Sequence, residues 1–173
     1  MVDYRVRTTR AYSEKIGELV AMLNYTRQTT LSEIAGLTQA ELDHLPEKNS
    51  NSIASLLLHI AAIEFVHQII SNENRDLTEH EYKKWSIALE LGDRARAKLT
   101  NLTLEHCLHE LQQVRGDTLN LLKSKQDAWL YKENKWDNGI SYNNYYLWFH
   151  VLEEEISHRG QIKAIIRVMR SKK

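Results

Sequence analysis

Four long stretches of this chain place apolar residues three and four positions apart, the spacing that gives an α-helix one apolar face. They lie at about residues 12–34, 53–70, 104–122 and 144–169. One proline and six glycines leave few helix breakers in 173 residues. Four amphipathic helices of this length pack most simply as a four-helix bundle, an all-α fold. The residues alone leave open whether the helices follow up-and-down order or include a crossover connection.

The segments between these helices also carry local signals. Asn and Ser side chains near Ser52 suit the start of the second helix, and Thr103 precedes the third. Thr78 and Glu81 have the spacing of a capping box, which predicts an additional, interrupted helix within 78–101. The polar and aromatic segment 125–145 predicts either a small strand pair or an irregular loop. No repeat or linker divides the chain, so residues 1–173 are expected to form a single helical-bundle domain.

Composition narrows the class of protein. Lys+Arg and Asp+Glu both number 23, and this balance argues against the basic surface of a nucleic-acid binder. No uninterrupted apolar run approaches the roughly 18–20 residues that cross a bilayer, and the first residues lack the apolar region of a signal peptide. The single cysteine, Cys107, excludes an internal disulfide and is typical of a reducing compartment. We therefore expect a cytoplasmic protein that binds neither membrane nor nucleic acid.

The last helix has polar residues in the middle of its apolar face. Glu154 and His158 lie one turn apart between apolar residues at both ends of the stripe. A buried carboxylate without a partner costs several kcal/mol, so Glu154 must be neutral, paired or bound to a cation. Two alternatives need no metal: Glu154 and His158 could pair with each other or with Arg27, which interrupts the apolar face of the first helix.

A metal site needs a third protein ligand, because catalytic zinc typically has three and a solvent position. His59 is the best candidate, since it lies on the apolar face of the second helix, and His67, two turns later, is the reserve. A histidine in that position is more often a core residue, and this remains the better interpretation of His67. The set His59, Glu154 and His158 suits Zn²⁺, Ni²⁺ or Fe²⁺ better than Mg²⁺ or Ca²⁺, which prefer oxygen ligands.

Two motifs of the chain resemble a known family. "SIASLLLHIAAIEFVH" in the second helix and "HVLEEEISHRGQIKAII" in the last are similar to the DinB/YfiT-like metal-binding four-helix proteins. The resemblance covers nearly the whole chain by helix order, and "HRGQI" at 158–162 is its most recognisable part. It implies a bundle with a crossover connection, one divalent metal ion among the helices and, in many members, a homodimer.

The chain departs from many members at one position. They have a histidine four residues before "HRGQI", where this chain has Glu154. In this respect it resembles the branch that includes mycothiol-dependent maleylpyruvate isomerase, with a His, Glu and His zinc site. Carried over, the resemblance implies His59, Glu154 and His158 as ligands of one divalent ion, with Zn or Ni as the expected metal. It also implies a small-molecule thiol of the bacillithiol or mycothiol type as a cosubstrate, and an electrophile.

Two functions remain open at this point. The first is a metal-dependent transferase or isomerase that uses a low-molecular-weight thiol, and the alternative is a non-catalytic, stress-associated metal-binding or interaction protein. A weaker third is hydrolysis with Glu153 or Glu155 as a base, although both are expected to project away from the stripe. No catalytic residue is assigned.

Several residues near the predicted site have open roles. We interpret Cys107 as a small buried hydrophobic residue rather than as a nucleophile. His150, at the edge of the stripe, is expected either to orient Glu154 or to pack near Trp148, and Gln161 to face the site. Aromatic residues of the 125–145 segment and just beyond it are expected to wall a pocket, form a dimer contact or simply pack; they are Trp136, Tyr142, Tyr145 and Tyr146.

Overall fold

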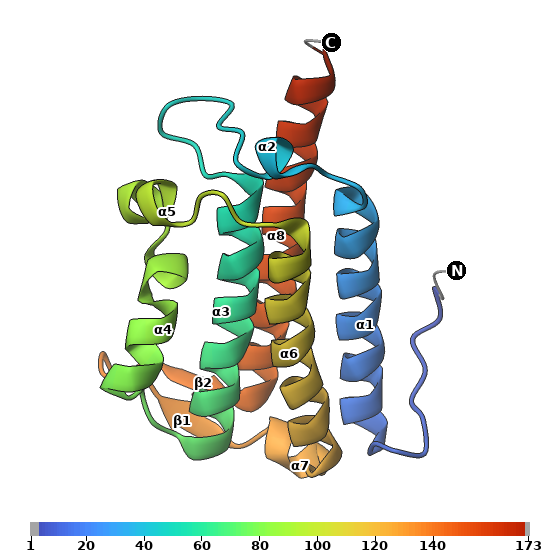
Figure 1. The fold of residues 1–173 in the computed structure, drawn as a ribbon. Coiled ribbons are helices and arrows are strands. Elements are labelled where there is room, and N and C mark those ends of the chain that lie inside the picture. Colours follow the sequence, from blue (N-terminus) through green and yellow to red (C-terminus); the bar gives the residue numbers. More distant parts are fainter. Residues whose placement is uncertain (1–3, 172–173) are drawn as a thin grey trace.

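The structure is a computed structural model that describes residues 4–171. Its frame is a bundle of the four long helices that the periodicity predicts (Figure 1). Two of them, α1 and α8, run in one direction, and α3 and α6 run in the other (Figure 1). Their bounds are α1 Glu14–Ile34, α3 Ile53–Glu73, α6 Leu104–Lys123 and α8 Asn144–Ser171. The all-α fold is confirmed.

The connection between α3 and α6 is a crossover. Helices α4 (Glu79–Glu90) and α5 (Gly92–Lys98) lead back along the outside of the bundle, so that α6 starts at the same end as α3 (Figure 1). The Thr78 and Glu81 capping box opens α4 as predicted, and the break between α4 and α5 falls at Leu91 and Gly92, which both have positive φ. A short α2 (Gln39–Leu42) lies in the α1–α3 connection.

The segment before α8 forms the strand pair rather than an irregular loop. After α7 (Asp127–Leu130), strands β1 (Glu133–Lys135) and β2 (Ser141–Asn143) pair antiparallel, with Asn134 opposite Tyr142. Gly139, with a φ of 80°, supplies the left-handed residue of the turn between them. The hairpin leads directly into α8 and so fixes where that helix begins.

The apolar interior consists of two clusters. One centres on α3 and includes Leu57, Leu111 and Ile162; the other lies near the opposite end of α1 and α8 and includes Leu23 and Trp148. On α1, α6 and α8, a buried charged residue separates the parts of the helix that belong to each cluster: Arg27, Arg115 and Glu155, respectively. The core of the bundle is therefore interrupted by a polar layer.

Helix α3 is the most apolar of the long helices. By length and composition alone it could cross a membrane, with a mean hydropathy of 1.8 over its best window. That window is 72% buried inside the bundle, and the core helix of a folded protein passes the same test. The polar residues His59, Glu64 and His67 interrupt it, and all three are buried. Its apolar character is explained by its central place in the bundle.

Candidate metal centre

The three residues singled out by the sequence meet where α3 packs against α8. His59 Nε2 lies 3.3 Å and His158 Nε2 3.0 Å from the same atom, Glu154 Oε2. Within residues 4–171, this is the one group of three His, Cys, Asp or Glu side chains placed to hold a metal ion. Bonds of about 2.0–2.1 Å in a tetrahedral site put neighbouring ligand atoms roughly 3.3 Å apart. The two separations from Glu154 Oε2 are close to that value, and the three ligand atoms all lie within 4.8 Å of one another.

His59 is oriented by the crossover. Its Nδ1 lies 2.8 Å from the carbonyl oxygen of Ala88, in the last turn of α4, where helix carbonyls lack a partner of their own. A carbonyl only accepts, so Nδ1 carries a proton and, in the neutral ring, Nε2 has the lone pair. That lone pair faces Glu154 Oε2, which is also an acceptor. Two acceptors at 3.3 Å require a cation between them, either a proton or a metal ion.

The charge states of the cluster favour metal binding. Burial acts to raise the pKa of Glu154, but the nearby imidazoles of His158, His150 and His59 outweigh it and lower that pKa. Burial, reinforced by His59, lowers the pKa of His158 despite the opposing effect of Glu154. At neutral pH the pair is therefore a carboxylate and a neutral imidazole, the forms that bind metals. His158 Nδ1 is buried with no hydrogen-bond partner among the described residues.

The two remaining histidines of this region lie beside the triad and outside it. His150 Nε2 is 3.8 Å from Glu154 Oε1, too far for a hydrogen bond, and its Nδ1 is 3.0 Å from Glu153, so His150 lies beside the candidate ligand without a hydrogen bond to it. His67 bonds through Nδ1 to the Ile63 carbonyl at 2.7 Å, and burial lowers its pKa to about 4. The interpretation of His67 as a neutral core residue fits this contact.

Arg27 does not pair with Glu154, contrary to one of the alternatives. Its guanidinium binds Glu155 at 2.8 and 3.1 Å and Glu64 at 2.9 Å. Arg115 binds Glu64 at 2.6 and 3.0 Å and Glu155 at 3.3 Å, and Thr118 donates to Glu64 at 2.7 Å. The two arginines also donate to main-chain carbonyls of α6 and α1. We call Arg27, Glu64, Arg115, Thr118 and Glu155 the buried charged layer.

Glu155 is the clearest surprise of this layer. The expectation that it projects away from the core-facing stripe is wrong, because Glu155 lies inside the bundle with 1% of it exposed and binds both arginines. Glu153 is exposed. The sequence contains a signal for the layer that the periodicity argument missed: Glu64 is the one acidic side chain within an otherwise apolar stretch of α3, and Arg115 is the one basic residue on the buried face of α6.

Three further residues for which the sequence gives expectations lie in or near this region. Cys107 is fully buried, and burial raises the pKa of its thiol to about 11, so it is a protonated core residue. Gln161 is exposed, and its side chain acts to raise the pKa of His158, which puts it beside the site. Trp148 is fully buried in the other part of the core.

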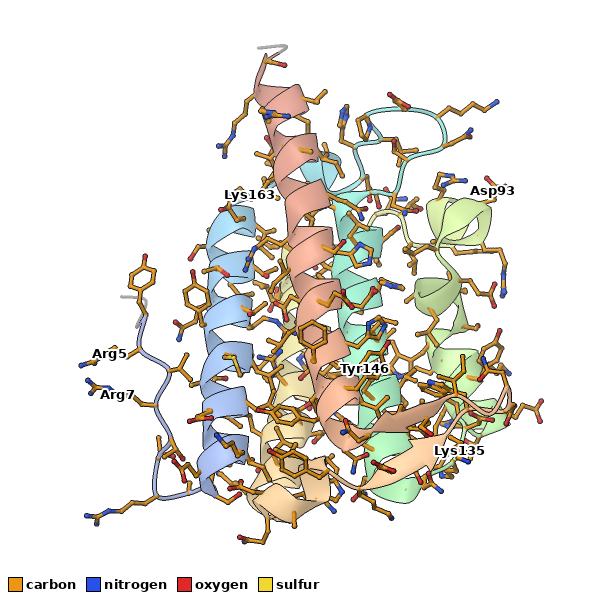
Figure 2. The ribbon with its side chains drawn as sticks, turned by 180° about the vertical axis from the view of Figure 1, so that it is seen from behind. Arg5, Arg7, Asp93, Lys135, Tyr146 and Lys163 are labelled. Atoms are coloured by element: carbon orange, nitrogen blue, oxygen red, sulfur yellow. The ribbon has the colours of Figure 1, made fainter. Side chains whose placement is uncertain are left out.

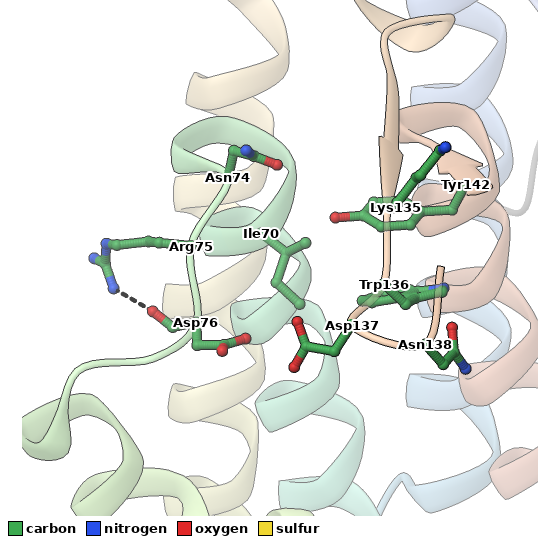
Figure 3. Close-up of a pocket in the computed structure, with 9 residues that line it drawn as sticks. All are labelled: Ile70, Asn74, Arg75, Asp76, Lys135, Trp136, Asp137, Asn138 and Tyr142. Atoms are coloured by element: carbon green, nitrogen blue, oxygen red, sulfur yellow. Dashed lines mark hydrogen bonds between the residues drawn. The ribbon is translucent and has the colours of Figure 1, made fainter. Parts of the chain in front are cut away.

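The aromatic segment does wall a pocket, although not with all four residues. Trp136 and Tyr142 stack with ring centroids 4.0 Å apart and line a cavity of about 460 Å³ between the hairpin and the α3–α4 connection (Figure 3). Tyr145 packs against Tyr131 instead, and Tyr146 stacks on His150. None of the three triad residues lines this cavity.

Comparisons with known proteins agree with the fold and the motifs. A crystal structure of a conserved protein from Enterococcus faecalis matches with a TM-score of 0.67 over 87% of this chain and 94% of that one; at 17% identity, this likeness shows the fold alone. A search of curated proteins found no match. A family model described as mycothiol-S-transferase matches residues 18–169, and the resemblance to DinB/YfiT-like proteins is confirmed. The chain belongs to the mycothiol-S-transferase family.

Proposed function

We propose that this protein is a metal-dependent S-transferase that joins a low-molecular-weight thiol, of the mycothiol or bacillithiol type, to a small electrophile. The observation that carries the proposal is the convergence of His59 Nε2, His158 Nε2 and Glu154 Oε2 on one point between α3 and α8. The family description supports the choice of thiol. A bound divalent ion would lower the pKa of the thiol and hold it as a thiolate.

The protein's own residues supply three features for this chemistry. The Ala88 carbonyl fixes the tautomer and ring plane of His59, and the His150 ring lies 3.8 Å from Glu154 Oε1, the carboxylate oxygen that faces away from the other two ligand atoms' shared contact. Three protein ligands leave a fourth position for the sulfur, and the 24% exposure of the Glu154 side chain gives that position access to solvent. Zn²⁺ or Ni²⁺ suits the two nitrogens and one oxygen, and a reducing cytoplasm suits a free thiol cosubstrate.

The electrostatics of the ligand set favour a thiolate over hydroxide. Glu154 would cancel one positive charge of a bound divalent ion, whereas three neutral histidines would cancel none. With Glu154 as a ligand, the site would therefore make bound water less acidic than a three-histidine site would, while it would still accept a polarisable sulfur ligand. This assigns Glu154 a role in the choice of reaction as well as in metal binding.

Metal content measured by mass spectrometry on untagged protein tests the first step, with His158→Ala as the matched variant. About one divalent ion per chain, lost in the variant, supports the site. The loaded protein is then assayed for conjugation of bacillithiol, mycothiol and glutathione to a chromogenic electrophile. Metal without turnover would favour the non-catalytic binding role, and no uptake of Zn²⁺ or Ni²⁺ would overturn the proposal.

A further inference from the structure

The hairpin and the α3–α4 connection enclose a cavity that the proposed reaction does not use. It has a volume of about 460 Å³ and is lined by the nine residues labelled in Figure 3. It lies where α3 ends and α8 begins, and Figure 2 shows Lys135 of the hairpin at the end of the bundle away from Lys163. A volume of roughly 300–1,000 Å³ is typical of small-molecule sites. We call this space the hairpin cavity.

Backbone hydrogen bonds hold both walls of the hairpin cavity in place. On one side, Asn74 caps α3 in the left-handed conformation, with a φ of 52°, and its N–H donates to the Ile70 carbonyl at 3.0 Å. On the other side, the Trp136 N–H donates to the Ile140 carbonyl at 3.0 Å and the Gly139 N–H donates to the Trp136 carbonyl at 2.8 Å, which closes the turn of the hairpin. The groups that face the cavity are therefore positioned before a ligand arrives, which reduces the entropic cost of binding.

The charges around the hairpin cavity are sorted by direction. The carboxylates of Asp76 and Asp137 point toward each other from opposite walls, whereas the Lys135 ammonium points away from both (Figure 3). Both aspartates are exposed, so a ligand can reach them. The interior of the cavity is therefore negative, although its lining holds as many bases as acids.

Arg75, the other base of the lining, already has partners. Its guanidinium binds Glu73 at 2.7 Å and Glu81 at 2.8 and 3.0 Å. It reaches Asp76 only through the main-chain oxygen, at 2.8 Å. No ion pair within residues 4–171 neutralises the carboxylate of Asp76 or that of Asp137. The two like charges therefore favour a cation between them.

An aromatic stack forms part of the wall on the hairpin side. The rings of Trp136 and Tyr142 have centroids 4.0 Å apart and planes inclined by 25°, so each ring covers one face of the other. Trp136 remains 37% exposed, and the Tyr142 hydroxyl points into the cavity (Figure 3). Burial, reinforced by Asp76, raises the pKa of Tyr142, so its hydroxyl stays neutral. Aromatic rings attract cations and also accept an alkyl chain, for which Ile70 supplies further apolar surface.

From these contacts we propose that the hairpin cavity binds a small organic ammonium ion, in the form of a linear di- or polyamine. Its ammonium groups lie between Asp76 and Asp137, and its carbon chain lies against Trp136 and Ile70. The aromatic and apolar wall favours such a ligand over a bare metal ion such as Mg²⁺ or Ca²⁺, which takes oxygen ligands. The cavity is separate from the triad, so this proposal depends on neither the metal nor the transfer reaction.

Calorimetric titration of the metal-free chain with spermidine at low ionic strength tests the proposal. We expect one ligand per chain and a dissociation constant below about 1 mM that rises with added salt. The net charge of the chain is zero, so a polyamine has little general attraction to it and a measurable affinity requires a local site. The uncharged diol analogue of putrescine should not bind. Absence of spermidine binding, or equal binding of the diol, would overturn the proposal.

Charge and ring variants locate the ligand. The double variant Asp76→Asn with Asp137→Asn should weaken spermidine binding at least about tenfold, because it removes both negative charges and keeps the side-chain shapes. Trp136→Ala should weaken binding about threefold to fivefold and Trp136→Phe less than about twofold, because Phe keeps an aromatic face. The matched control Asp117→Asn, at an exposed position of α6, should bind as the wild type does. Unchanged affinity in the double variant would contradict the assigned site.

Thermal unfolding supplies a second readout. A ligand that bridges the hairpin and the α3–α4 connection binds only the folded chain, so spermidine should raise the unfolding temperature of the wild type and leave that of the double variant unchanged. His158→Ala should keep both the affinity and the temperature shift, because it removes only a triad residue. Loss of spermidine binding in His158→Ala would place the amine at the triad and overturn the proposal. Failure of metal binding and failure of amine binding are thereby distinguished.

Discussion

The bundle contains two polar clusters, and they differ in how far their groups are satisfied. In the buried charged layer, two carboxylates meet two guanidiniums, so the charges cancel, and hydrogen bonds of 2.6 to 3.3 Å link the groups on all four long helices. In the triad, one carboxylate oxygen meets two imidazole nitrogens, and His59 Nε2 faces it as a second acceptor. The first cluster is satisfied by its own charges, whereas the second needs a proton or a metal ion between its acceptors.

This contrast separates a structural cluster from a binding site by the arrangement of donors and acceptors. Both lie on α3 and α8, and Glu154 and Glu155 are neighbours in sequence, so neither burial nor position distinguishes them. A saturated network stabilises one packing of the helices, whereas converging acceptors cost free energy until a cation arrives. The same substitution at the two clusters should therefore have different effects.

The largest effect on stability is expected in the buried charged layer. Glu64→Gln leaves the guanidiniums of Arg27 and Arg115 with too little negative charge, and removal of one partner from a buried network typically costs about 3–5 kcal/mol. Urea unfolding at neutral pH measures this loss. The exposed control Glu105→Gln should stay within about 0.5 kcal/mol of the wild type. A Glu64→Gln loss below 1 kcal/mol would contradict the structural role of the layer.

The next effect concerns His67, which the charges of both clusters influence. Burial lowers its pKa from 6.5 to about 4, so the unfolded chain binds a proton in this range that the folded chain does not. Stability should therefore fall as the pH decreases from 6.5 to 4, by about 3 kcal/mol in all. Urea unfolding of metal-free protein at several pH values checks this.

Two variants identify the residue responsible for that pH dependence. His67→Gln should flatten the loss between pH 6.5 and 4, whereas His109→Gln, at an exposed position, should keep it. Equal slopes in the wild type and in His67→Gln would show that His67 titrates normally in the folded chain.

A smaller effect on stability is expected at the triad, together with a large effect on binding. Glu154→Gln removes the negative charge and allows the amide N–H₂ to donate to an imidazole nitrogen, so the stability of metal-free protein should change by less than about 1 kcal/mol. The affinity for Zn²⁺ should fall at least about 100-fold, because an amide is a poor ligand. Calorimetric titration and unfolding measure the two quantities on the same samples. A stability loss as large as that of Glu64→Gln would remove the distinction between the clusters.

The smallest effect is expected from exchanging one ligand for another. Glu154→His should keep the metal and add one unit of positive charge, which should lower the pKa of bound water and strengthen hydroxide relative to thiolate. The measurement is the pH dependence of thiol binding in the Co²⁺-substituted protein by absorption spectroscopy. Unchanged thiol binding together with an unchanged pKa of bound water would remove the role given to Glu154 in the choice of reaction.

The triad was predictable from the sequence because helical spacing reports the faces of a helix directly. Glu154 and His158 stand out from the apolar residues of α8, and His59 does so within α3, so each can be assigned to a core face without its partners. The capping box of Thr78 and Glu81 and the break after α4 are equally local.

The buried charged layer was not predictable by the same reasoning. Its partners lie between 37 and 128 residues apart in sequence, and a single buried charge does not indicate which opposite charge it meets. The sequence therefore suggests Glu154 as a possible partner of Arg27, whereas in the structure Arg27 binds Glu155. Helix spacing could not give the direction of α6 either, because that depends on the course of the α3–α6 connection.

The contact between His59 and the Ala88 carbonyl has a consequence for how such a site could be varied. The four helices that build the bundle carry all three candidate ligands, but the ring of one ligand is aimed by α4, which is an excursion from the bundle. A small shift of α4 would re-aim the His59 ring and change the reactivity of the centre while all three ligands stayed the same. Because Trp85 and Ala88 of α4 also belong to the apolar core, such a shift couples the chemistry of the site to the packing of the crossover.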